Sequence, residues 1–126
     1  MSVKPSLQAL WLADEVNLND DGKVTVGGMF DEITVRSGED FTTRAYLFFS
    51  LRDIHGRVSL RLTYTNLNDN DVLLERTFNV TGEPLQTTDI KVLIDEIPVP
   101  HAGSYVWELF HGDDQLGSTR VEAKVV

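Results

Sequence analysis

The chain contains no cysteine, so neither a disulfide bond nor a thiolate metal ligand can form. The lack of disulfides fits a cytoplasmic protein, and we expect that location. The first residues, Met1–Pro5, do not have the layout of a signal peptide. Leu7–Ala13 is too short an apolar run to cross a membrane and is followed at once by Asp14 and Glu15.

Basic side chains are scarce. The sequence has 11 lysines and arginines against 20 aspartates and glutamates, which gives a formal net charge of −9. Nucleic acids and anionic membranes attract positively charged surfaces, so we expect neither as a partner. The acidic surface would keep the protein soluble, and it would also suit a basic protein partner.

The metal-binding patterns are incomplete. Asn17–Gly22 resembles the first half of a calcium loop, but Gly28 occupies the position where calcium needs a bidentate glutamate. We therefore interpret this segment as a hairpin turn. The three histidines match no zinc-ligand spacing; they are His55, His101 and His111. The sequence predicts no metal site and no cofactor.

Catalytic patterns are missing as well. No serine lies in a nucleophile motif, and Gly27-Gly28 is not a phosphate-binding loop. Acidic residues occur as the neighbours Asp14-Glu15, Asp31-Glu32 and Asp95-Glu96. Adjacent residues of a strand point to opposite faces, so none of these pairs forms an acid–base dyad by itself. We predict no catalytic residue, and the alternative is an enzyme whose carboxylates or histidines meet only in the fold.

What the sequence does contain is a set of strand patterns, clearest in Pro98–Phe110. Two prolines and Gly103 predict a turn. Tyr105, Trp107 and Leu109 then alternate with smaller or polar residues, as in a strand with one buried face. The position of the tyrosine just after the turn resembles the tyrosine corner of Greek-key sandwiches. We interpret these aromatic side chains as core rather than as a stacking platform for a sugar or base.

Similar alternation recurs along the chain, for example in Val58–Thr65, with turn residues between the segments. About eight short strands at regular spacing predict an all-β, antiparallel two-sheet sandwich with an immunoglobulin-like Greek key. A chain of 126 residues without a linker is expected to form one domain, residues 1–126.

Phe41–Ile54 departs from simple alternation, because Tyr46 and Phe48 stand opposite the face that carries Ala45, Leu47 and Phe49. A half-exposed strand should be polar on one face, so something must cover these two rings. Leu7–Val16 is also apolar on both faces and could fold over them. Another molecule could do the same, since exposed apolar patches often mark interfaces. We therefore predict an interface at Tyr46 and Phe48, with a homodimer as the simplest case.

Two segments resemble an uncharacterised family of small bacterial immunoglobulin-like β-sandwich proteins. One comprises Ala13–Val16, Asp21–Val26 and Gly28–Asp31, and the other is Pro98–Leu109. The resemblance implies a sandwich fold but no activity and no functional residue.

The sequence thus favours a non-catalytic binding or assembly module that joins a protein partner or a second copy of itself. The alternatives are the enzyme described above and a carbohydrate-binding module, which would need two or more exposed aromatic rings in a row.

Overall fold

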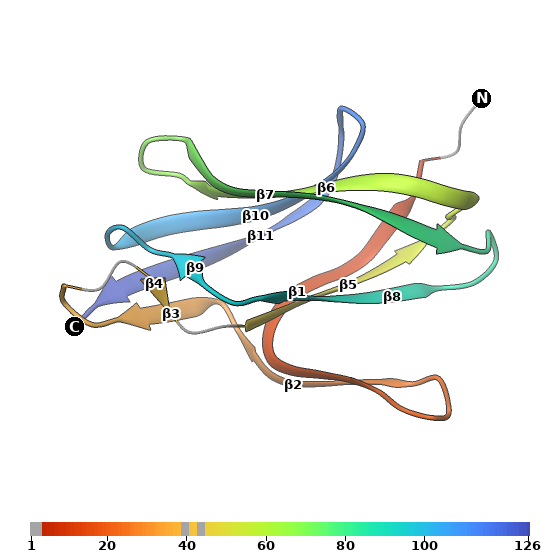
Figure 1. The fold of residues 1–126 in the computed structure, drawn as a ribbon, viewed down its shortest axis with the longest axis horizontal. Coiled ribbons are helices and arrows are strands. Elements are labelled where there is room, and N and C mark those ends of the chain that lie inside the picture. The colour runs from red at the N-terminus through yellow and green to blue at the C-terminus, as the bar shows by residue number, and fades with distance from the viewer. Residues whose placement is uncertain (1–3, 39–40, 43–44) are drawn as a thin grey trace.

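The computed structural model describes residues 4–38, 41–42 and 45–126 of the chain, and in these residues it is built from strands. The first three residues and two residues of the expected strand Phe41–Ile54 therefore lie outside the described part. Two sheets face each other (Figure 1), and buried apolar side chains of both form one core cluster. The expectation of an all-β protein with two sheets is confirmed.

One sheet has four strands in the order β2-β1-β5-β8. Their bounds are β1 (Ser6–Leu18), β2 (Val24–Phe30), β5 (Ala45–Arg52) and β8 (Thr88–Ile94). The other sheet has five strands in the order β3-β11-β10-β6-β7. Their bounds are β3 (Glu32–Val35), β6 (Gly56–Asn66), β7 (Asp71–Gly82), β10 (Gly103–His111) and β11 (Asp114–Val125). β4 (Phe41–Thr42) and β9 (Ile97–Pro98) form a separate short pair.

The expected number of about eight strands is wrong, because the described residues contain eleven. The sequence predicts a strand over Val24–Val35 with a break near Gly27-Gly28. The break lies instead at Asp31, between β2, in the four-stranded sheet, and β3, in the five-stranded sheet. β4 and β9 have two residues each, which is too few for an alternating pattern to be visible. β3 pairs in parallel with β11, whereas the other pairings are antiparallel.

The core lies between the two sheets. Tyr105, Trp107 and Leu109 are fully buried in it, as the alternation in Pro98–Phe110 predicts. The Trp107 and Tyr64 rings lie 4.4 Å apart, centroid to centroid, and both face the apolar side chains of β5. The Tyr105 hydroxyl donates a hydrogen bond to the His101 carbonyl at 2.5 Å, which fixes the turn before β10. These aromatic side chains are therefore core residues and form no stacking platform.

Candidate functional site

The outer face of the four-stranded sheet carries the residues that the sequence singles out as an interface. Strand register places Trp11 opposite Phe48 and Ala13 opposite Tyr46 on neighbouring strands. On the other side of β5, Phe48 lies opposite Lys91. Side chains directly opposite each other in an antiparallel pair share a face of the sheet. Two aromatic rings of β5 thus lie beside Trp11 on the face that points away from the core.

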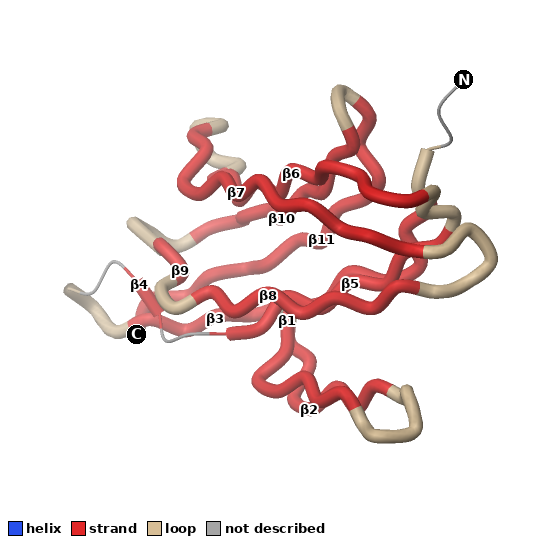
Figure 2. Tube along the Cα trace, turned by 45° about the vertical axis from the view of Figure 1, so that its right-hand side comes forward, coloured by secondary structure: helices blue, strands red, loops and turns tan. Residues whose placement is uncertain are grey.

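The β1–β2 hairpin covers part of this outer face. Figure 2 shows the hairpin projecting from the plane of the other strands rather than continuing the sheet. Val16, Val24 and Val26 of the hairpin pack with Phe48 and Ala13 in a small cluster separate from the main core. We name the segment Asp14–Phe30 the arm. The side chain of Phe48 is only 5% exposed, so it is covered by its own chain.

The arm is held by backbone geometry and by one bond across the sheet. Gly28 has a φ of +66°, which glycine adopts without the cost that a side chain would add. Lys91 Nζ of β8 donates a hydrogen bond to the Val16 carbonyl at 3.2 Å. The same ammonium group lies 5.4 Å from the centre of the Tyr46 ring, within the range of a cation–π contact. The hydrogen bond from Lys91 therefore connects the arm to β8, the edge strand on the other side of the sheet.

Tyr46 is half-buried and lines a hollow of about 190 Å³ beneath the arm. Asp14, Glu15 and Lys91 also line it, so this hollow gathers two carboxylates and an ammonium group. As adjacent residues of a strand, Asp14 and Glu15 point to opposite faces. Both nevertheless line the hollow beneath the arm. The enzyme alternative needs a pocket lined by at least two ionisable groups with polar partners, and this hollow supplies the ionisable groups.

Trp11 is the residue that sequence reasoning missed. Its indole is stacked on Phe48 at 6.0 Å between ring centroids, yet it remains 43% exposed. Leu7–Val16 is apolar on both faces in the sequence, but the arm covers the sheet beside Trp11 and not Trp11 itself. The sequence feature that could have predicted this exposure is the small size of Ala9 and Ala13, which lie on the same face of β1. Their methyl groups leave the edges of the indole accessible to solvent.

A second, larger hollow lies beside Trp11. Its volume is about 340 Å³, and its lining residues are Trp11, Leu12, Met29, Phe30, Asp31 and Thr119. They come from β1, from β2 and the residue after it, and from β11, so the hollow joins the edges of the two sheets. We name it the edge hollow. Its lining is mostly apolar, with one carboxylate.

The segments considered for metal binding are used by the fold itself. In the turn Asn17–Gly22 and the residues after it, Asn19 donates a side-chain hydrogen bond to Thr25, and Asp21 accepts one from the Lys23 amide. His101 contacts the buried side chain of Asn66 at 3.2 Å. Across the described residues, no three histidine or acidic side chains are grouped so that they could hold a metal ion.

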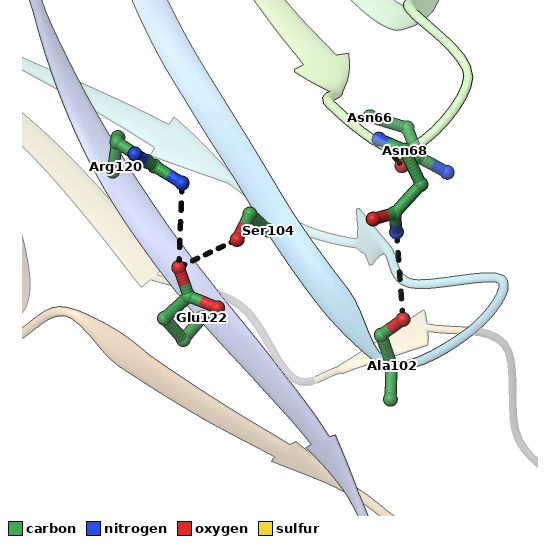
Figure 3. A network of polar contacts seen from close by, with 6 residues as sticks. All are labelled: Asn66, Asn68, Ala102, Ser104, Arg120 and Glu122. Carbon is green, nitrogen blue, oxygen red and sulfur yellow. Dashed lines mark hydrogen bonds and ion pairs between the residues drawn. The ribbon is translucent and has the colours of Figure 1, made fainter.

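Polar side-chain contacts on β10, β11 and the nearby turns are mostly exposed. Figure 3 shows Glu122 between Ser104 and Arg120, at 2.6 Å and 3.8 Å respectively. It also shows Asn68 donating a hydrogen bond to the Ala102 carbonyl. Exposed pairs of this kind contribute little to stability. Glu122 links β11 to Ser104 of β10, and Asn68 links the turn after β6 to the turn before β10.

In the described part of the chain, no helix is long and apolar enough to cross a membrane.

Comparison with known proteins adds a family assignment. No curated protein matches the sequence. A model described as a family of unknown function (DUF6941) matches residues 8–124. Because that match covers nearly the whole chain, the protein belongs to DUF6941, a family of unknown function.

Proposed function

We propose that this protein is a non-catalytic binding module that recognises a protein partner through the outer face of its four-stranded sheet. The observation that carries the proposal is the exposed indole of Trp11 beside the edge hollow. Tryptophan side chains contribute strongly to protein interfaces when they are fixed and can be desolvated by the partner. The stacking of Trp11 on Phe48 supplies that fixed position without further loss of side-chain entropy.

The proposed interface is therefore centred on Trp11, on the same face of the sheet as the predicted contacts Tyr46 and Phe48. Phe48 offers little surface of its own and supports the ring of Trp11 from behind. Tyr46 is half-buried at the border of the arm. We keep both residues within the proposed surface, with Trp11 as its main contact.

The test is capture from a lysate of the native host by three immobilised proteins. These are the wild type, Trp11→Glu and the control Val72→Glu, which places the same charge at an exposed position of β7, in the other sheet. We expect a partner that binds the wild type and the control but not Trp11→Glu. Circular dichroism melting of each variant shows that the fold is intact. Equal capture by all three folded proteins would refute the proposed surface.

A second candidate function is an enzyme or small-ligand site in the hollow beneath the arm. Two carboxylates and Lys91 line this space, which favours a polar ligand. A panel of small metabolites, screened by the shift in melting temperature, tests it, because a ligand that binds only the folded state raises that temperature. A shift that Lys91→Met abolishes would support this candidate, whereas a screen without any shift would speak against it.

In the homodimer version of this proposal, the protein partner is a second copy of the chain, and light scattering at high micromolar concentration tests it.

A carbohydrate-binding function has less support. Among the described residues, Trp11 is the one aromatic side chain with a largely exposed ring, and a sugar platform would need at least two in a row.

The finer description of the fold is also a proposal. An immunoglobulin-like Greek key is supported by the parallel pairing of β3 with β11 and by the hydrogen bond from Tyr105 to the turn before β10. The resemblance of Pro98–Leu109 to bacterial proteins of that fold supports a bacterial origin. The lack of cysteine supports a cytoplasmic location, and the net charge of −9 supports partners other than nucleic acid or anionic membrane.

A further inference from the structure

The edge hollow has a mostly apolar lining and one carboxylate, that of Asp31, and this combination specifies the chemistry of a partner. We propose that it receives a single apolar side chain of a partner protein, flanked in the partner's sequence by lysine or arginine. This inference rests on the proposed function and deepens it, because it names the kind of segment that the outer face recognises.

The apolar part of the argument concerns Trp11 and Met29. Met29 is 58% exposed, so two large apolar side chains border the hollow while remaining open to solvent. Leu12 and Phe30, which are paired across β1 and β2, also line it and belong to the packing of the main core. The floor is therefore held by the fold, while the flexible methionine can adjust to the shape of an incoming side chain. Such a site suits an aliphatic or aromatic anchor.

The charged part concerns Asp31, whose side chain lines the hollow. Within the described residues, no lysine, arginine or histidine lies within ion-pairing distance of its carboxylate. The next acidic residue, Glu32, is already paired with Lys124 at 3.1 Å. A partner with a basic residue beside its anchor would supply the missing countercharge.

The same charges disfavour a second copy of the chain as the occupant. Each molecule has a formal net charge of −9. A symmetric contact through this surface would bring Asp31 of both copies close together, and like charges across an interface are costly. A basic segment of another protein meets no such repulsion, and electrostatic attraction would also speed its association.

Defined peptides test the inference directly. The first probe is a short peptide with one phenylalanine between two lysines. The second replaces both lysines by glutamate, and the third replaces the phenylalanine by glycine. The chain has two tryptophans, and since Trp107 is fully buried, a fluorescence change on titration reports on Trp11. We expect the first peptide to bind most tightly and the other two to lose most of that affinity.

Matched variants separate the two parts of the site. We expect Met29→Ala to weaken binding of the first peptide, whereas Val72→Ala, at a position that is 56% exposed on β7, leaves it unchanged. We expect Asp31→Asn to weaken binding about two- to fivefold, the range of an exposed ion pair. The control Asp113→Asn, in the turn before β11, should have no effect. Added salt should reduce the Asp31 effect, because salt screens exposed charges.

Four results would overturn the inference. The first is equal binding of the lysine and glutamate peptides, and the second is the same affinity for Asp31→Asn and Asp113→Asn. The third is a dimer of the wild type, seen by light scattering, that Met29→Ala dissociates, since the occupant would then be a second copy. A host protein whose capture depends on Trp11, together with peptides that do not bind, would refute this inference and leave the proposed function standing.

Discussion

Gly28 gives the sharpest test of how the arm is held over the sheet. In Gly28→Ala the new residue must keep a φ of +66°, a left-handed conformation that costs a residue with a side chain about 1–2 kcal/mol. The added Cβ would also lie 3.0 Å from Asp14 Cβ, inside the distance of about 3.5–4.0 Å that carbon atoms prefer. Crowding of this kind costs about 1–3 kcal/mol more. We expect a total loss of about 2–5 kcal/mol in the free energy of unfolding.

The assay is urea denaturation of this variant beside Gly22→Ala. Gly22 has a φ of +81°, but no atom lies within 4 Å of the position that its Cβ would take. The control therefore carries only the conformational cost, about 1–2 kcal/mol. Combining Gly28→Ala with Asp14→Gly in a double-mutant cycle isolates the crowding as a coupling energy. Equal losses for the two single variants, or a coupling energy near zero, would refute this account of the arm.

Three further outcomes are expected. Trp107→Ala should lower the free energy of unfolding by about 3–5 kcal/mol in urea, because the indole is fully buried, and a loss below about 1 kcal/mol would contradict that. Burial, with a smaller contribution from Tyr105, raises the pKa of Tyr64 well above its ordinary value. The unfolded chain then releases this proton first, so the stability that the Tyr64 hydroxyl contributes should be present in full below about pH 10 and be lost as the pH rises above it. In Tyr64→Phe the alkaline fall should be smaller, and an unchanged pH profile would count against the buried hydroxyl. Neither calcium nor zinc at millimolar concentration should raise the melting temperature, whereas a saturable rise would restore the calcium interpretation of Asn17–Gly22.

The sequence predicts best where one strand buries one face. Alternation alone placed Tyr105, Trp107 and Leu109 in the core, and the structure agrees. The same reasoning recognised that Tyr46 and Phe48 need a cover. It left open whether that cover is this chain or another molecule, because the answer depends on how the arm folds over the sheet.

The candidate site was less predictable. A pattern of apolar and polar residues indicates how many faces of a strand are apolar. It does not indicate which residues of an apolar face another segment covers. Trp11 is exposed because the arm packs on Phe48 and leaves its neighbour open. The edge hollow combines Trp11, Asp31 and Thr119, which lie far apart in sequence and meet only where the edges of two sheets approach. No local motif encodes such a meeting.

The parallel pairing of β3 with β11 has a consequence for the order of events during synthesis. Glu32 and Glu122 are partners in this pairing, so β3 cannot pair with β11 until the ribosome has added the next 90 residues, 33–122. β10 likewise lacks one of its two neighbours until β11 is made. Unpaired strand edges are prone to join other chains. We therefore expect the nascent protein to be most exposed to misassembly just before its last strand emerges, and a chaperone that binds extended segments would protect it during that interval.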